Sequence, residues 1–264
     1  IKVFYYISPQ IWAWEQNRVH KIKKVVDKMF VILPFEKDFY KKFDMEVDFV
    51  GHPLIDAIAA ERKVQPTFEE FTSANNLQNK PIIALLPGSR KQEISAMLPI
   101  MLSSINDFPD YQFVVAGAPS QEFALYEPFL KAGNADVIFG KTYDLLQQSE
   151  AALVTSGTAT LETALFKLPE VVCYKGSAIS YAIAKQLIKV KYISLVNLIM
   201  DREVVKELIQ GELNTVMLKD ELSKVLKGGE KRDKLQADYD ELIQKLGGAG
   251  ASEKTAQLMI DNLT

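Results

Sequence analysis

The sequence predicts an α/β fold built on parallel β-sheets, and three observations carry this prediction. Short, almost entirely apolar segments such as Ile82–Leu86 alternate with longer segments whose apolar residues recur at helical spacing. Strands that are apolar throughout are typical of parallel sheets with helices on both faces. Several strands run directly into turns of small residues, as at Pro87–Arg90 and Ser156–Thr158. The 264 residues are 48% hydrophobic, which suffices for one large or two small domains.

The first series of alternating elements covers residues 1–57. We expect strands at Val3–Ile7, Met29–Leu33 and Val47–Val50, and helices at Ile11–Val26 and Glu36–Phe43. A doubly wound domain usually needs on the order of 100 to 150 residues, so this segment is expected to be the C-terminal portion of a larger Rossmann-like domain. The opening residues already form a strand and Ile1 is not a methionine, which leads us to expect a fragment.

The remaining chain predicts a linker, a complete second domain and C-terminal helices. Residues 54–80 lose strand character and are expected to form a helix and a linker between two domains, with the linker at residues 58–80. Residues 81–200 are expected to form a second αβ series. Its strands are expected at Ile82–Leu86, Gln112–Ala116, Asp136–Phe139, Ala151–Val154 and Glu170–Cys173. Residues 201–264 are expected to be helical at Arg202–Gln210, at Lys219–Leu246 and from Ser252 onward. These helices complete the second domain and either return to the first or exchange with a partner in a homodimer.

The composition excludes several classes of protein. A net charge of −3 argues against a nucleic-acid-binding protein. The single cysteine, Cys173, excludes an internal disulfide, and its apolar neighbours favour a buried structural thiol over a reactive one. One cysteine and two histidines leave little material for a soft-metal site, and we expect neither a metal nor a cofactor. No segment approaches the roughly 18 apolar residues of a membrane span.

The turn Pro87-Gly88-Ser89-Arg90 is a candidate anion-binding site. Glycine lets the backbone approach a ligand, serine adds a hydroxyl, and arginine pairs with a phosphate in a fork geometry that lysine cannot match. Glu93 lies near the start of the following helix, where the helix dipole favours a carboxylate. The simpler interpretation is an ordinary strand-to-helix loop with a solvated arginine.

The turn Ser156-Gly157-Thr158 has the same character and is followed by Thr160 and Glu162. The first N–H groups of a helix are unpaired and hold anions readily. Glu162 adds a carboxylate suited to the hydroxyls of a ribose. The simpler interpretation is helix capping by small hydroxyl residues, with Glu162 as a first-turn acid.

Together the two turns predict a nucleotide-diphosphate site. Both follow strands of one parallel sheet, and the carboxyl edge of such a sheet is where open α/β folds bind ligands. Neither turn has the G-x-G-x-x-G pattern, and no G-K-[ST] loop is present. A dinucleotide fold with NAD and a P-loop ATPase are therefore disfavoured.

Other residues after strand ends are candidates for the opposite wall of a cleft. Trp12 and Trp14 follow Ser8 after the first strand, and His52 follows the third strand. The tryptophans either pack into a domain core or contact an apolar acceptor. A lone histidine is more often structural. Asn197 is a polar residue within an apolar run, so it is expected to have a specific partner, either a ligand or the backbone.

An amphipathic stripe is a candidate for contact with a membrane surface. Ile179, Ile183 and Leu187 are spaced four residues apart, and Lys185 and Lys189 lie off this stripe. Basic amphipathic helices bind interfaces, although most helices of this kind merely cover a sheet.

The order of these motifs resembles that of the lipid-A-disaccharide synthases, glycosyltransferase family 19. The resemblance extends over nearly the whole chain, and the motifs are specific in combination although Pro-Gly-Ser-Arg alone is not. The segments that carry it are Ser8–Trp14, Leu33–Glu36, Phe49–Pro53, Pro87–Arg90, Ser156–Glu162 and Ser194–Leu198.

The resemblance implies a GT-B glycosyltransferase with two Rossmann-like doubly wound domains, the first of them truncated here. The implied reaction is inverting and independent of metals. UDP-2,3-diacylglucosamine donates its sugar to 2,3-diacylglucosamine 1-phosphate (lipid X), which gives a β(1→6)-linked disaccharide 1-phosphate and UDP. This step of lipid A biosynthesis takes place at the cytoplasmic face of the inner membrane of Gram-negative bacteria, where the protein is expected to be peripheral.

The resemblance also implies roles for single residues. Arg90 and the N–H groups of Ser156–Thr158 stabilise the leaving diphosphate, with Gly88, Ser89, Glu93 and Thr160 in the same site. Glu162 holds the ribose, and Asn197 positions the diphosphate or sugar. The family's glycine-rich opening and acidic candidate base have no counterpart here, so the base is expected before Ile1. Another UDP-sugar enzyme of this architecture, such as a 2-epimerase, and a UDP-sugar binding module without turnover are the alternatives.

Overall fold

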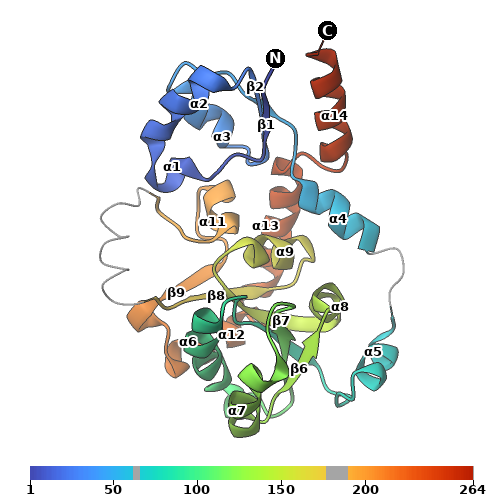
Figure 1. Cartoon of the computed structure of the whole chain (residues 1–264). Helices are drawn as coiled ribbons and strands as arrows, with labels where there is room; N and C mark the ends of the chain where they lie inside the picture. Colours follow the sequence, from blue (N-terminus) through green and yellow to red (C-terminus); the bar gives the residue numbers. More distant parts are fainter. Residues whose placement is uncertain (62–65, 177–189, 264) are drawn as a thin grey trace. The chain divides into compact units, whose positions relative to one another are not determined.

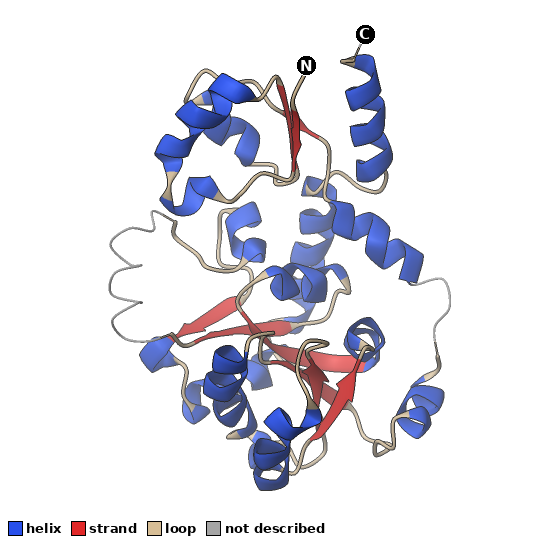
Figure 2. Ribbon diagram, viewed as in Figure 1, coloured by secondary structure: helices blue, strands red, loops and turns tan. Residues whose placement is uncertain are grey.

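The computed structural model describes residues 1–61, 66–176 and 190–263. The chain divides into two compact units (Figure 1). Unit 1 contains Ile1–Ala60 and the residues from Asp240 onward, and unit 2 contains most of the residues between Glu61 and Tyr239. Each unit is built on a parallel sheet with helices around it (Figure 2), so the predicted α/β class with parallel sheets is confirmed.

Unit 1 is built on a three-stranded sheet in the order β1-β2-β3. Its strands are β1 (Phe4–Tyr6), β2 (Lys28–Val31) and β3 (Asp48–Phe49). Its first helices are α1 (Ile11–Trp14), the 3₁₀ turn η1 (Gln16–Arg18), α2 (Val19–Val25), α3 (Glu36–Lys41) and α4 (Pro53–Glu61). The central strand supplies Met29, Phe30 and Val31, which are fully buried.

The single helix expected at Ile11–Val26 is interrupted at Glu15, which corrects that prediction. Glu15 has φ −130° and ψ 54°, outside the helical region. The side-chain amide of Gln16 donates to the Trp12 carbonyl oxygen at 3.0 Å, the group that the Gln16 backbone would bond in a continuous helix. A side chain therefore ends α1, and the chain restarts as η1 and α2.

The C-terminal residues belong to unit 1. Helix α14 (Ala251–Asp261) follows the end of α13 (Arg232–Lys245). The Asp56 carboxylate accepts a hydrogen bond of 2.6 Å from Gly250 N, and His52 N donates to Leu246 O at 3.2 Å. These contacts attach the helix end and the following turn to the segment after β3.

Unit 2 is built on a six-stranded parallel sheet in the order β6-β5-β4-β7-β8-β9. The strands are β4 (Ile82–Leu86), β5 (Gln112–Gly117), β6 (Asp136–Phe139), β7 (Ser149–Thr155), β8 (Glu170–Tyr174) and β9 (Lys206–Ile209). The first five agree with the sequence-based prediction. Strands β4, β5 and β7 are buried over most of their length, as expected for a sheet covered on both faces.

The helix expected at Arg202–Gln210 is wrong, because this segment contains β9. Its apolar residues, Val204, Val205, Leu208 and Ile209, recur at a spacing that also fits a helix. The segment forms a strand because the open edge of β8 offers it backbone hydrogen-bond partners. Val171 lies opposite Lys206 at one end of this pairing, and Tyr174 lies opposite Ile209 at the other. Pairing along that edge satisfies the backbone and outweighs a weak local preference.

The helices of unit 2 form layers against its sheet. They are α5 (Phe68–Ala74), α6 (Lys91–Leu102), α7 (Phe123–Gly133), α8 (Thr142–Gln148), α9 (Thr158–Leu165), α11 (Leu195–Met200), α12 (Thr215–Val225) and the first part of α13, with 3₁₀ turns η2 (Ile105–Asp107) and η3 (Gln210–Glu212). Helix α6 contacts α7 and α12, α5 contacts α8, and α9 contacts α11 (Figure 1).

The helix expected at Lys219–Leu246 is two helices, α12 and α13. The chain between them contains Gly228, at φ +83°, and Gly229. A Cβ atom at Gly229 would clash with the Lys224 carbonyl oxygen, so only glycine fits there. The two glycines thus let the chain turn sharply. In a continuous helix they would lower stability, because glycine loses more conformational entropy than other residues when it becomes helical.

Part of the segment expected as a linker is folded. Within residues 58–80, α5 begins with a capping box in which Thr67 and Glu70 exchange hydrogen bonds of 2.8 and 3.2 Å. Phe71 of this helix is 2% exposed and packs in the core with Ile82 and Val114. Helix α5 therefore belongs to unit 2.

Candidate functional site

The two small-residue turns lie next to each other at the carboxyl edge of the unit 2 sheet. Pro87–Arg90 follows β4 and Ser156–Thr158 follows β7, and the two strands are neighbours in which Leu86 pairs with Val154. The chain proceeds from β4 towards β6 on one side and from β7 towards β9 on the other. The reversal falls between β4 and β7, the position at which open α/β sheets bind ligands.

The Glu93 carboxylate occupies the turn after β4. Its Oε2 accepts hydrogen bonds of 3.3 Å from Ser89 N and from Arg90 N, and its Oε1 accepts one of 2.7 Å from Arg90 Nη1. Burial raises the pKa of Glu93, but the hydrogen bonds from Arg90 and Ser89 outweigh it and hold the pKa below the ordinary value. A carboxylate thus takes the donors that sequence reasoning assigned to a phosphate, while the Arg90 side chain stays 81% exposed.

The loop after β5 also reaches this turn, which sequence reasoning missed. The side-chain amide of Gln121 donates to the Ser89 carbonyl oxygen at 3.2 Å, and Ser120 Oγ lies 3.5 Å from the same oxygen. Both residues follow the carboxyl end of β5, so their position after a strand was the signal that could have found them. They brace the Ser89 backbone from the neighbouring strand.

The turn after β7 keeps its backbone donors outward and its hydroxyls inward. Ser156 Oγ donates to Ile193 O at 2.8 Å, and Thr160 Oγ1 donates to Gly157 O at 2.8 Å. Thr160 is fully buried, whereas Gly157 and Thr158 are exposed. Of the backbone donors, Ser156 N is taken by Cys173 O and Thr160 N by Gly157 O, each at 3.2 Å, so the expected donation from Ser156 N to a diphosphate is corrected. Within the described ranges the N–H groups of Gly157 and Thr158 have no such acceptor. Gly157 and Thr158 therefore offer backbone donors to an anion, and the two hydroxyls fix the shape of the turn.

Glu162 has a partner that sequence reasoning did not identify. Tyr143 Oη donates to Glu162 Oε1 at 2.8 Å, and both side chains are half-buried. Tyr143 lies in the first turn of α8, shortly after the carboxyl end of β6, and this position was again the available signal. Burial raises the pKa of Tyr143, and the neighbouring carboxylate raises it further, so the hydroxyl remains a donor.

Asn197 is fully buried, and the fold uses every hydrogen-bonding position of its amide. Oδ1 accepts from Val204 N at 2.7 Å and Val205 N at 3.0 Å, and Nδ2 donates to Val205 O at 2.8 Å and Glu207 Oε1 at 2.9 Å. An amide oxygen accepts two bonds and an amide nitrogen donates two. In this arrangement Asn197 holds the segment before β9 and has no free position for a diphosphate or sugar.

Glu207 connects Asn197 to the turn after β7. Its carboxylate accepts hydrogen bonds of 2.9 Å from Ser194 N and of 3.0 and 3.2 Å from Ile193 N. The carbonyl oxygen of Ile193 is the acceptor of the Ser156 hydroxyl. A chain of hydrogen bonds thus leads from Asn197 through Glu207 and Ile193 to Ser156.

The acceptor-side candidates of unit 1 also follow strand ends. Ser8 comes after β1, and its Oγ lies 3.0 Å from Tyr40 Oη and 3.5 Å from Glu36 Oε1. Glu36 comes after β2 and accepts from Leu33 N at 3.0 Å. Burial raises the pKa of Glu36 despite these bonds. The structure brings Ser8 to a buried carboxyl group that sequence reasoning did not select.

The tryptophans and His52 differ in exposure. Trp12 is 6% exposed and packs edge-on against Phe35 with 4.9 Å between ring centroids, whereas Trp14 is 60% exposed. His52 follows β3, is 4% exposed, and its Nδ1 accepts from Leu54 N at 3.2 Å. Burial lowers the pKa of His52 to about 4. Trp12 and His52 therefore belong to the packed interior, and Trp14 is the aromatic side chain of this group that faces solvent.

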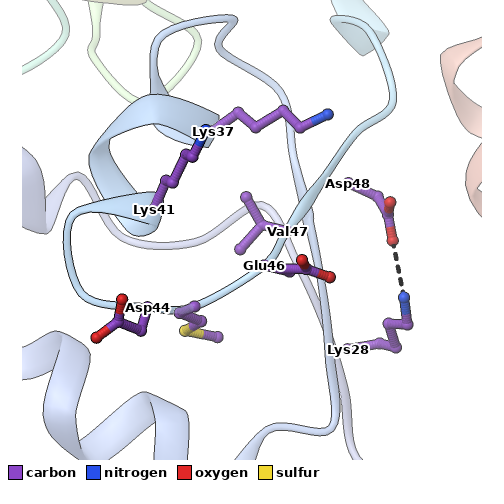
Figure 3. A pocket seen from close by; sticks show the side chains of 8 residues that line it. Lys28, Lys37, Lys41, Asp44, Glu46, Val47 and Asp48 are labelled. Atoms are coloured by element: carbon purple, nitrogen blue, oxygen red, sulfur yellow. Dashed lines mark hydrogen bonds and ion pairs between the residues drawn. The ribbon is translucent and has the colours of Figure 1, made fainter.

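A pocket of about 560 Å³ lies at the amino edge of the unit 1 sheet, opposite the carboxyl edge after which Ser8 and His52 follow. Figure 3 shows the side chains that line it. The pocket adjoins the first residues of β2 and β3, where the Lys28 ammonium pairs with the Asp48 carboxylate at 3.3 Å. Its lining is Lys28, Lys37, Lys41, Asp44, Met45, Glu46, Val47 and Asp48. Three ammonium and three carboxylate groups balance, so the pocket has no net charge that would select an anionic ligand.

The candidate membrane-interface residues lie outside the described residues: Ile179, Ile183, Lys185, Leu187 and Lys189. Among the helices of the described ranges, none has both the length and the hydropathy that crossing a bilayer requires. Within the same ranges, no group of three or more His, Cys, Asp or Glu side chains is placed to share a metal ion.

Comparison with solved structures agrees with this architecture. A UDP-GlcNAc 2-epimerase from Neisseria meningitidis bound to UDP-GlcNAc matches 99% of this chain and 70% of its own, with a TM-score of 0.62 and 15% identity. The wall teichoic acid polymerase TagF matches 93% of this chain and 58% of its own, with a TM-score of 0.56 and 14% identity. At such identities the likeness shows the fold alone, an α/β architecture with parallel sheets.

Comparison of sequences gives the family. The family described as lipid-A-disaccharide synthetase matches residues 1–261. The lipid-A-disaccharide synthase of Syntrophus aciditrophicus is 40% identical over 267 aligned residues, which cover 98% of this chain and 69% of the relative. The lipid-A-disaccharide synthase of Geobacter metallireducens is 37% identical over 272 aligned residues, which cover 100% of this chain and 69% of the relative. The chain therefore belongs to the lipid-A-disaccharide synthase family.

Proposed function

We propose that this protein is an inverting glycosyltransferase of lipid A biosynthesis. It transfers 2,3-diacylglucosamine from UDP-2,3-diacylglucosamine to lipid X, and the products are the β(1→6)-linked disaccharide 1-phosphate and UDP. The observation that carries the proposal is the family match over residues 1–261, together with 40% identity to a synthase along almost the whole chain. The turns at the switch point of the unit 2 sheet support it, since a UDP-sugar needs an anion site there.

The donor half of the mechanism follows from charge development on the leaving group. As the acceptor hydroxyl attacks the anomeric carbon, the bond from that carbon to the diphosphate oxygen breaks and UDP leaves with the electron pair. The Arg90 guanidinium leaves its ion pair with Glu93 and binds the diphosphate instead. The N–H groups of Gly157 and Thr158 also donate hydrogen bonds to the diphosphate. Donors fixed in advance stabilise such charge strongly in the transition state. The proton of the hydroxyl passes to a base that we assign to no residue of this chain.

The remaining donor-site residues hold the nucleotide or shape the site. Glu162 accepts hydrogen bonds from the ribose hydroxyls. Gly88 and Ser89 bring the backbone to the diphosphate, while Thr160 supports the second turn. Asn197 acts indirectly by holding Glu207 and, through Ile193, the Ser156 hydroxyl.

On the acceptor side we propose that Trp14 faces lipid X and that the buried residues Ser8, Trp12 and His52 support this wall from behind. Exposed Trp14 contacts the apolar substrate directly, and Ser8, Trp12 and His52 shape the surface behind it. His52 is neutral at pH 7 because burial lowers its pKa to about 4, so in this role it is a neutral hydrogen-bonding group.

We also propose that the protein works as a peripheral protein on the cytoplasmic face of the inner membrane. Both substrates carry acyl chains and stay in the bilayer, so the enzyme must meet them at its surface. Liposome flotation of the Lys185→Glu and Lys189→Glu variants tests whether the stripe at residues 179–189 contacts the membrane. We expect weaker liposome binding, and unchanged binding would mean that the stripe only covers a sheet.

We further propose a homodimer. Analytical ultracentrifugation of the unmodified protein tests its oligomeric state.

Turnover assays decide between the proposed activity and its alternatives. With UDP-2,3-diacylglucosamine and lipid X we expect UDP release together with a tetraacyl disaccharide 1-phosphate. Turnover of soluble UDP-GlcNAc without acylated substrates would favour an epimerase or another glycosyltransferase instead. Calorimetric binding of UDP without any turnover would favour a binding module.

A further inference from the structure

The hydroxyl of Tyr143 and the carboxylate of Glu162 form a hydrogen bond between two helices that follow different strands. The Oη to Oε1 distance is 2.8 Å, and the residues lie on α8 after β6 and on α9 after β7. The two residues are nineteen positions apart in sequence, so no local rule of helix geometry creates this contact. Among the described residues, Glu162 Oε2 has no hydrogen-bond partner.

The tyrosine is a fixed anchor. Its ring packs against Phe166 with 5.2 Å between centroids and an interplanar angle of 52°, and both rings lie against the core that contains Leu145 and Val154. A glutamate side chain has three rotatable bonds and loses much freedom when a ligand orders it. Because the Tyr143 hydroxyl already holds one carboxylate oxygen, part of this conformational entropy is lost before the ligand binds, and binding costs less free energy.

The chemistry of the pair fits an adjacent diol. The tyrosine donates and the carboxylate only accepts, so hydroxyl groups of a ligand can still donate to Oε2 and to the second lone pair of Oε1. Burial and the nearby carboxylate keep the Tyr143 hydroxyl protonated by raising its pKa. The bond therefore persists over the physiological pH range and holds the carboxylate as an acceptor.

We propose that Tyr143 is a positioning residue which presents the Glu162 carboxylate to the 2′- and 3′-hydroxyls of a nucleotide, and that it thereby sets the preference for ribonucleotides over 2′-deoxyribonucleotides. The inference rests on the proposed function of Glu162 as the ribose ligand. A purely structural link between α8 and α9 is the competing explanation. It predicts the same loss of affinity for both kinds of nucleotide.

Calorimetry with UDP and 2′-deoxy-UDP tests the inference on the whole protein. We expect the wild type to prefer UDP and the Tyr143→Phe variant, which keeps the ring, to bind UDP about five- to tenfold more weakly. Its affinity for 2′-deoxy-UDP, which keeps only the 3′-hydroxyl, should fall less, so the preference for UDP narrows. Tyr111→Phe is the matched control, because this substitution also removes a tyrosine hydroxyl. Tyr111 precedes β5 and so lies at the amino edge of the sheet, away from the proposed ribose site.

The Glu162→Gln variant separates this inference from the proposed function. If Glu162→Gln abolishes the preference for UDP and Tyr143→Phe retains it, Glu162 is the ribose ligand and the inference about Tyr143 is wrong. If Glu162→Gln keeps the preference, the assignment of Glu162 itself fails. Equal weakening of both nucleotides by Tyr143→Phe, or a wild type without any preference, also overturns the inference.

Discussion

Gly88 and Glu93 approach so closely that a Cβ atom at Gly88 would lie 2.7 Å from Oε2 of Glu93. Gly88 has φ +105°, a conformation that other residues rarely adopt. The absence of a side chain therefore serves two purposes here. It permits the backbone conformation of the turn, and it leaves room for the carboxylate that accepts from the Ser89 and Arg90 N–H groups.

The Gly88→Ala variant should lose stability and nucleotide affinity together. Backbone strain and the displaced Glu93 carboxylate should lower the free energy of unfolding by about 1–3 kcal/mol. Urea denaturation measures this loss, and calorimetry with UDP measures the affinity. Gly211→Ala is the matched control, since Gly211 has no positive φ and a methyl group added there would meet no atom within 4 Å. Equal unfolding midpoints for the two variants would refute the explanation.

The Arg90→Ala variant should lose activity far more than stability. The guanidinium is 81% exposed and, among the described residues, pairs only with the neighbouring Glu93, so unfolding should change by less than about 0.5 kcal/mol. Turnover should fall about 100-fold or more if Arg90 stabilises the departing diphosphate. Steady-state kinetics with both acylated substrates gives this number. Lys91→Ala removes the adjacent exposed cation as a control, and normal activity of Arg90→Ala would rule out the role.

The Asn197→Ala variant should be strongly destabilised. It removes the bonds of Asn197 to Val204 N, Val205 N and Val205 O and one of the donors to Glu207 Oε1, which should cost about 3 kcal/mol. Thermal unfolding beside the exposed Asn106→Ala control would show this. A variant with normal stability and lost UDP affinity would instead make Asn197 a direct ligand.

Stability of unit 1 should fall as the pH drops below about 6.5, because His52 is buried in its neutral form. Its pKa is about 4 in the folded state and 6.5 ordinarily, so between these values only the unfolded chain binds the proton. By linkage, the unfolding free energy decreases by up to about 1.4 kcal/mol per pH unit in this window.

Denaturation of the His52→Gln variant at pH 7 and pH 4.5 checks this prediction by difference. The variant should show a smaller loss of stability over this range than the wild type. Exposed His20→Gln serves as the control and should retain the wild-type pH dependence. An identical pH dependence in His52→Gln and the wild type would contradict the assignment.

The strands of unit 2 could be predicted because their signals are local. Ile82–Leu86 and Ala151–Val154 are apolar along their whole length, and small residues follow each of them. The segment Lys206–Ile209 could not be predicted in the same way. Its spacing suits a helix as well as a strand, and only the open edge of β8 made it a strand.

The sequence by itself determined the family of the chain, its parallel α/β class and the two small-residue turns of the proposed donor site, since these depend on residue type and short spacing. The tertiary structure decided which polar groups remain free. It put the Glu93 carboxylate on the donors of the first turn, used all of Asn197 in holding the segment before β9, and placed Tyr143 beside Glu162. Hydrogen-bond partners of buried groups come from neighbours in space, and the fold alone brings those neighbours together.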